Sequence, residues 1–167
     1  MDPHLLTALV AAIGGVEDRA ALDSTCSACA VALDVDGVAV TLTRSSLDES
    51  VVGASDLPGK RLKEAELSAG EGPCVDAART GRTVATADLT DAADGQWPDL
   101  LGYLKTSPIR AVIAIPLADG EESIGSFNLY SARPHGLDHL DPASVEVIAA
   151  AMGDTVRRVT AHLDGRA

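Results

Sequence analysis

The residues best placed to do chemistry lie in the segment 70–81, which begins with the run Gly-Glu-Gly-Pro-Cys. Gly70 and Gly72 permit a tight loop, and Pro73 suits the first turn of a helix because its missing N–H is not needed there. The free N–H groups of that turn favour an anion. The same dipole would stabilise a thiolate at Cys74, which suits a redox or electrophile sensor or a metal ligand. The alternative is that Cys74 is a small buried side chain.

Further side chains are candidates for lining a ligand cup: Asp76, Trp97, Tyr103, Arg110 and Asn128. Trp97 lies in a segment expected to cover a sheet, and Asn128 is a polar residue inside an apolar strand. Arg110 enters another strand and could bind a carboxylate or phosphate through two parallel hydrogen bonds. The alternative is that Trp97 fills the cup itself. In that case Arg110 pairs with Asp88 or Asp76.

A second cysteine motif, Cys26-Ser-Ala-Cys29, has the spacing of a metal or redox pair. Together with Cys74 it would offer three thiolates to a metal or an iron–sulfur cluster. Both cysteines also recur at helical spacing with Leu22 and Leu33, which indicates the buried face of a helix. A second Cys-x-x-Cys does not occur in the sequence. We therefore predict core packing and no metal site.

The elements that must position these residues follow from periodicity and from turn signals. Helices are expected over 3–13, 17–33 and 141–163, with a short helix at 100–104 and a short helix or irregular segment at 57–67. Strands are expected at 38–42, 51–54, 83–87, 111–117 and 123–130, with a polar hairpin loop at 45–49, an acidic loop at 88–98 and a hairpin turn at Asp119-Gly120. The spacing of the last helix extends over five turns, so part of it is expected to pair with a second copy.

The composition narrows the function classes. The 167 residues, 46% of them hydrophobic, predict a single globular domain. The formal net charge is −12 and basic residues do not cluster, which argues against direct binding to nucleic acid. Transmembrane and signal segments are not found, so we expect a cytoplasmic protein that does not bind membranes. The sequence leaves the cofactor unknown.

Four motifs in order resemble those of a GAF domain. They are Leu-Ser-Ala-Gly-Glu-Gly-Pro-Cys-Val-Asp-Ala at 67–77, Gly-Arg-Thr-Val at 81–84, Ile-Arg-Ala-Val at 109–112 leading to Ile-Pro-Leu at 115–117, and Ile-Gly-Ser-Phe-Asn-Leu-Tyr at 124–130. The resemblance runs from about 17 to 163. The Gly-Glu-Gly-Pro-Cys loop, with Trp-Pro at 97–98, is similar to bacterial GAF domains that often accompany an ANTAR RNA-binding module. The chain has no room for that module, so we expect a stand-alone sensor or part of a longer protein.

The resemblance implies an α+β fold with a six-stranded, mainly antiparallel sheet and helices on both faces. It places one GAF domain over 1–167, with an N-terminal helix at 1–15, a core at 17–137 and a C-terminal helix at 141–163. GAF ligands include cyclic nucleotides, tetrapyrroles, haem, small acids and iron, and the terminal helices commonly form a dimer. The Asn-Lys-Phe-Asp-Glu constellation of cyclic-nucleotide GAF domains is not found here, which argues against that ligand.

The function expected from these observations is small-molecule sensing in signal transduction or transcriptional regulation, by a homodimer that acts on a regulatory partner. The alternatives are a ligand-free dimerisation module and a redox sensor that uses Cys74. One GAF lineage reduces free methionine sulfoxide, with a catalytic cysteine that would fall near Lys105. The sequence has no cysteine after Cys74. We therefore predict that the chain is not an enzyme.

Overall fold

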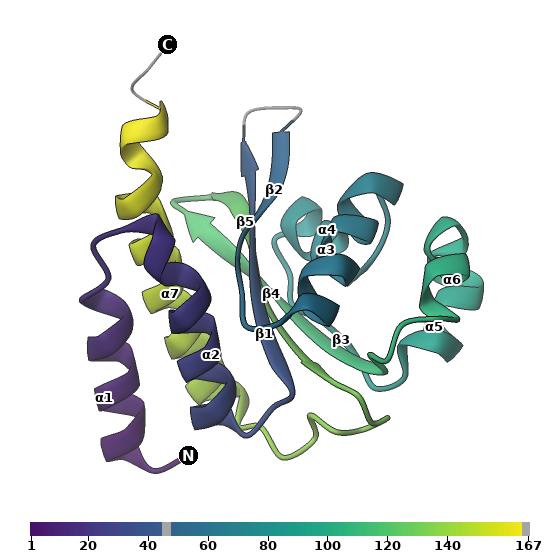
Figure 1. Cartoon of the computed structure of the whole chain (residues 1–167), viewed down its shortest axis with the longest axis horizontal. Helices are drawn as coiled ribbons and strands as arrows, with labels where there is room; N and C mark the ends of the chain where they lie inside the picture. The colour runs from purple at the N-terminus through teal and green to yellow at the C-terminus, as the bar shows by residue number, and fades with distance from the viewer. Residues whose placement is uncertain (45–47, 165–167) are drawn as a thin grey trace.

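One antiparallel sheet separates two layers of helices (Figure 1). The computed structural model describes residues 1–44 and 48–164. On one face of the sheet lie α1 (Pro3–Gly14), α2 (Leu22–Leu33) and α7 (Pro142–Asp164), and on the other lie α3 (Leu57–Ala69), α4 (Pro73–Thr80), α5 (Leu89–Gln96) and α6 (Pro98–Leu104). A short 3₁₀ helix, Arg19–Ala21, precedes α2. None of the described helices is both long and apolar enough to cross a membrane. The predicted α+β class, with helices on both faces, is confirmed.

Five strands form the sheet in the described residues, not the six that the resemblance implied. They are β1 (Gly37–Arg44), β2 (Asp48–Ala54), β3 (Val84–Thr86), β4 (Ala111–Asp119) and β5 (Glu122–Ser131), in the order β2-β1-β5-β4-β3. All neighbours are antiparallel. The predicted turn at Asp119-Gly120 joins β4 to β5, and Gly120 has the positive φ that such a turn requires. Of the loop expected at 45–49, residues 45–47 lie outside the described part.

The segment between β3 and β4 is where the sequence was misinterpreted. The acidic loop expected at 88–98 is mostly the helix α5, and Pro98 then begins α6. Leu89, Trp97 and Leu100 are buried on the sheet side of this segment. The segment has few large apolar residues and several aspartates, so no helical spacing is evident and the sequence suggested a loop. Because this segment is helical, it adds no strand to the sheet.

The face covered by α1, α2 and α7 contains the larger apolar core. The helical stripes predicted on α2 and on α7 are both buried there, from Leu22 and Cys26 to Met152 and Val156. The hydroxyl of Thr155 donates to the carbonyl of Ile13 at 2.9 Å, which fixes the end of α1 against α7. Thus α1 covers part of the long α7 face that was expected to pair with a second copy. The homodimer itself stays a prediction.

The alternation of β5 divides its side chains between the two faces as expected. Phe127 and Leu129 lie in the larger core, whereas Tyr130 packs under α3 and α6 with Leu62 and Leu104. Strict alternation along β5 would put Ile124 on the Tyr130 side, but Ile124 packs on the opposite face. The reason is an irregularity in the register between β4 and β5, adjacent to Leu117. A bulge of this kind reverses the side of every residue beyond it.

Two glycines let α3 approach the sheet. A Cβ on Gly37 or on Gly59 would lie 2.1 Å or 1.6 Å from atoms of the Tyr130 side chain. The Tyr130 hydroxyl donates to Asp56 Oδ1 at 2.7 Å, and the same oxygen accepts the N–H of Gly59 at 2.9 Å. Asp56 therefore caps α3 and also joins its first turn to β5.

Candidate functional site

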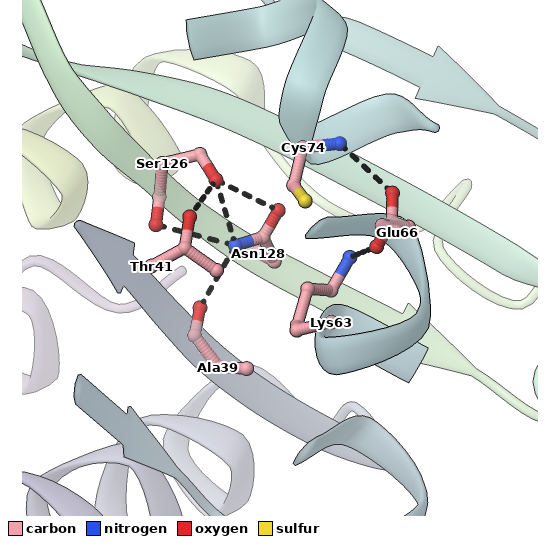
Figure 2. Close-up of polar contacts among 7 residues, drawn as sticks. All are labelled: Ala39, Thr41, Lys63, Glu66, Cys74, Ser126 and Asn128. Carbon is pink, nitrogen blue, oxygen red and sulfur yellow. Dashed lines mark hydrogen bonds and ion pairs between the residues drawn. The ribbon is translucent and has the colours of Figure 1, made fainter. Parts of the chain in front are cut away.

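A cluster of buried polar side chains lies between the sheet and the helices α3 and α4 (Figure 2). Thr41 of β1 and both Ser126 and Asn128 of β5 come from the sheet, and Lys63 and Glu66 come from α3. These five residues, called the polar cluster below, are all buried. Burying so many polar groups is unfavourable unless they bond to one another, and the contacts show that they do.

The sheet half of the cluster is a hydrogen-bonded chain across two strands. Thr41 Oγ1 and Ser126 Oγ are 2.7 Å apart, as expected for residues that face each other in the β1–β5 register. The amide nitrogen of Asn128 donates to Ser126 Oγ at 3.0 Å and to the carbonyl oxygen of Ala39 at 3.2 Å. The Asn128 carbonyl oxygen has Ser126 Oγ as its described donor, at the longer distance of 3.3 Å.

The helix half of the cluster is an ion pair that ties α3 to α4. Lys63 Nζ lies 2.5 Å from Glu66 Oε2, and both side chains are fully buried. The other carboxylate oxygen, Oε1, accepts the backbone N–H of Cys74 in the first turn of α4 at 3.0 Å. The anion that the sequence predicted for this helix terminus is thus supplied by the chain itself. Gly72 makes room for it, because a Cβ there would lie 2.4 Å from Glu66 Oε1.

The two halves together place several kinds of polar group on one face of the sheet. Hydroxyl and amide groups supply donors and acceptors, and the ion pair supplies one group of each charge. In a buried site these interactions are stronger than in water, since water does not screen them. The opposite charges of Lys63 and Glu66 balance, so the cluster carries no net charge of its own.

Two of the residues predicted for the site, Cys74 and Asn128, meet at this cluster. Cys74 is 1% exposed, and Figure 2 shows its side chain projecting from α4 on the side where Asn128 lies. Reaction of this thiol with an external oxidant would therefore require α3 or α4 to move. The role of Cys74 as a ligand or redox residue stays a prediction.

Two other predicted residues, Trp97 and Asp76, bond to each other. The indole nitrogen of Trp97 donates to Asp76 Oδ2 at 2.9 Å, and the Trp97 ring is buried among Leu62, Leu100 and other apolar side chains under α3 and α6. In this conformation Trp97 fills space on the face of the sheet that α3 to α6 cover, called the roofed face below. This agrees with the alternative interpretation. The indole–carboxylate bond also holds the α5–α6 junction against α4.

Arg110 and Tyr103 lie at the margin of the roofed face. Arg110 Nη2 contacts both carboxylate oxygens of Asp88, at 3.0 Å and 2.9 Å, which is one of the two pairings that the sequence suggested. Hydrogen bonding to Arg110 holds the pKa of Asp88 below its ordinary value. Tyr103 is half-buried against the same apolar cluster, and burial raises the pKa of its hydroxyl. Their contact with a ligand stays a prediction.

The remaining cysteines belong to the other side of the sheet. Cys26 and Cys29 are buried in the core under α2, whereas Cys74 lies with α3 and α4. Burial raises the pKa of Cys29 to about 12 and that of Cys26 further still. The structure therefore separates the three thiols that the sequence could have combined in one site, and it keeps the first two protonated.

The sequence did not single out Lys63, Glu66, Thr41 or Ser126. A lysine and a glutamate three residues apart on a helix ordinarily form an exposed pair. The sequence weakly indicated that Thr41 and Ser126 face the same side of the sheet. Each is next to a buried apolar residue, Val40 or Phe127, and adjacent residues of a strand point to opposite faces. Only their pairing across β1 and β5, which the sequence leaves undetermined, brings them together.

The chain is similar to known proteins over most of its length. The family model for the GAF domain matches residues 19–156 of the chain. Among curated proteins, the regulatory protein LuxO of Vibrio cholerae is 34% identical over 76 residues. That alignment covers 46% of this chain and 14% of LuxO, so the chain corresponds to only a small part of that protein.

Solved structures agree in fold over nearly the whole chain. The GAF domain of a phosphoenolpyruvate-protein phosphotransferase from Coxiella burnetii superposes with a TM-score of 0.73 at 14% identity, covering 96% of this chain and 95% of that one. Free methionine-R-sulfoxide reductase from Neisseria meningitidis superposes with a TM-score of 0.70 at 19% identity, covering 95% of this chain and 89% of the reductase. A third structure is a domain described as part of a two-component sensor histidine kinase from Sinorhizobium meliloti 1021. It superposes with a TM-score of 0.65 at 20% identity, covering 89% of this chain and 96% of that domain.

The reductases among these structures overturn the prediction that the chain is not an enzyme. The Neisseria protein was solved with its substrate, and reductases of the same kind from Staphylococcus aureus and Thermoplasma acidophilum also share the fold. A sheet roofed by helices can enclose a small molecule to react with it as well as to sense it. The missing cysteine near Lys105 argued against one arrangement of catalytic residues, and it does not exclude catalysis by this fold.

Proposed function

The chain belongs to the GAF domain family, and on this basis we propose that it is a small-molecule-sensing domain in signal transduction or transcriptional regulation. The observation that carries the proposal is the polar cluster between the sheet and α3 and α4. A buried ion pair commonly stabilises a fold no more than apolar side chains of similar volume do. Five polar residues in the centre of this face are therefore better explained by recognition of a ligand than by stability.

A ligand in this position would act through the contacts between elements. Glu66 joins α3 to α4, and Asn128 joins β5 to β1. A molecule that bonds to either residue would therefore change how α3 and α4 pack on the sheet. Such a change occurs only if the ligand binds one arrangement better than the other. We propose that the readout is a regulatory protein partner, in the cytoplasm.

We retain the homodimer as part of the proposal. Val147 on α7 and Leu5 on α1 are large apolar side chains exposed on the helical layer away from the roof. This is the layer that the resemblance assigns to dimerisation. A dimer formed there would leave α3 and α4, which cover the polar cluster, free to move when a ligand binds.

Native mass spectrometry of freshly purified protein tests the proposal. We expect a dimer carrying a discrete additional mass, and loss of that mass in the variant Ser126→Ala, which removes one hydroxyl from the cluster. Ser24→Ala is the matched control, because it removes the same kind of hydroxyl from an exposed serine of α2, on the other side of the sheet. Equal melting temperatures for both variants would show that the lost mass is not a folding defect.

The other outcomes decide between the alternatives. A dimer without added mass, unaffected in melting temperature by a panel of polar metabolites, would favour the ligand-free interaction module. A mass retained equally by Ser126→Ala would place the ligand elsewhere. The thiol-sensor alternative predicts that Cys74→Ser abolishes a response to peroxide, and an unchanged response would contradict it.

A further inference from the structure

An acidic groove runs beside the edge strand β2, along α2 and the start of α3. It consists of two hollows that share Asp56. The first, of about 280 Å³, is lined by Asp23 of α2, by residues 51–54 of β2 and by Leu57 and Lys60 of α3. The second, of about 450 Å³, is lined by α2 from Ser27 to Asp34 and by residues 35–36 and 55–56. We call the two hollows together the Asp56 groove.

The charge of the groove is fixed by the fold. Four aspartates line it, namely Asp23, Asp34, Asp36 and Asp56, against the single cation Lys60. Three of these carboxylates accept hydrogen bonds from the protein. Asp23 accepts the N–H of Ala54 at 2.9 Å, Asp36 the N–H of Ala132 at 2.7 Å, and Asp56 the hydroxyl of Tyr130 at 2.7 Å. Because these bonds hold the carboxylates in place, little further ordering is needed when a cation binds.

The groove also exposes apolar surface at both ends. Val31 is 83% exposed in the larger hollow, and Leu57 is 54% exposed in the smaller one. The smaller hollow is also lined by β2, an edge strand with a neighbour on one side only. Edge strands offer unpaired backbone groups to an extended segment, and alternate side chains of that segment can enter flanking pockets.

We propose that the Asp56 groove docks a basic segment of a partner protein, in which arginines or lysines alternate with small apolar residues. Cations meet the fixed aspartates, and apolar side chains meet Val31 and Leu57. A second copy of this chain is a poor occupant, because the protein carries 25 acidic residues against 13 basic ones. The groove includes none of the five residues of the polar cluster, and the proposal does not depend on the sensing function.

Nuclear magnetic resonance titration of the full chain tests this docking. The probe is a short synthetic peptide in which arginine alternates with valine, compared with its glutamate counterpart and with spermine. We expect saturable shifts at residues 27–36 and 51–57 with the arginine peptide only. Val31→Lys should weaken binding about tenfold or more. The matched control Ala85→Lys adds the same charge at an exposed residue of β3, the opposite edge of the sheet, and should change the affinity less than about twofold.

Three outcomes would overturn the proposal. Shifts spread over the whole acidic surface, or equal weakening by both variants, would mean that only general charge attraction is at work. Displacement of the peptide by an equivalent concentration of spermine would mean that the apolar contacts contribute nothing. Because Val31 and Ala85 are both exposed, both variants should keep the wild-type melting temperature, and this is measured alongside the titration.

Discussion

At the scale of single residues, the Glu66 carboxylate has the largest structural effect in the site. One of its oxygens bonds Lys63 and the other bonds the N–H of Cys74, while Gly72 leaves the space that it occupies. If the carboxylate were neutralised, the buried Lys63 ammonium would lose its counter-charge. The charge of Glu66, and not only its shape, is therefore needed.

The variant Glu66→Gln tests this requirement. We expect it to lower the free energy of unfolding by about 3–5 kcal/mol, because it keeps the side-chain volume but leaves the Lys63 ammonium buried without a counter-charge. The double variant Lys63→Met with Glu66→Gln should recover most of that loss. Urea unfolding followed by circular dichroism measures both.

The exposed pair Asp154–Arg157, also three residues apart, provides the control. Asp154 is 69% exposed, so Asp154→Asn should leave the unfolding curve nearly unchanged. A Glu66→Gln variant as stable as this control, or a double variant no better than the single one, would contradict the argument.

A second prediction at this scale concerns Asp88 and Arg110. Arg110 lowers the pKa of Asp88 from its ordinary value of 3.8, so the charged carboxylate stabilises the fold above that pH. This stabilisation is lost as the pH falls through the lowered pKa. We expect Arg110→Met to raise the pKa of Asp88 towards 3.8, as followed by carbon-detected nuclear magnetic resonance. The pKa of Asp141, which hydrogen bonds from Ser144 lower, should not move.

At the scale of elements, α3 is positioned by the contact between Tyr130 and Gly59. The variant Gly59→Ala would place a Cβ 1.6 Å from the Tyr130 hydroxyl oxygen, and the rigid ring leaves no room for it. We expect a loss of about 1–3 kcal/mol in the free energy of unfolding. Gly14→Ala, at a glycine with no heavy atom within 4 Å of the added Cβ, should be neutral or stabilising. Equal stability of the two variants would show that Tyr130 does not set the position of α3.

The elements also show how far sequence patterns could predict this fold. The helical stripes of α2 and α7 and the alternation in β5 were confirmed. A helical period of three to four residues, or a strand period of two, can be recognised without knowing which elements pack nearby. The pattern failed for α5, whose apolar residues are few, and for Ile124, which lies beyond a bulge. For the site, Asn128 was recognised as a polar residue in an apolar strand. Lys63 and Glu66 were not, because their burial depends on how α3 packs.

At the scale of the whole molecule, the net charge of −12 disfavours the compact state through repulsion among surface carboxylates. Dissolved salt screens exposed charges but acts less on the buried Lys63–Glu66 pair. We expect the melting temperature to rise by about 2–4 °C for each kcal/mol of repulsion that added sodium chloride removes. Calorimetry over a series of salt concentrations measures this. A falling melting temperature would mean that favourable surface pairs outweigh the repulsion.

The contact between α1 and α7 has a consequence for the order of events during synthesis. Thr155 and Ile13, which it joins, are 142 residues apart in the chain. At ribosomal rates of about 5–20 residues per second, α1 emerges roughly 7–28 s before its partner exists. Through that interval Leu9 and Ile13, both buried in the finished protein, lack the cover of α7. The helix α1 is thus translated well before its packing is completed, and a nascent chain stalled before α7 would present it to chaperones.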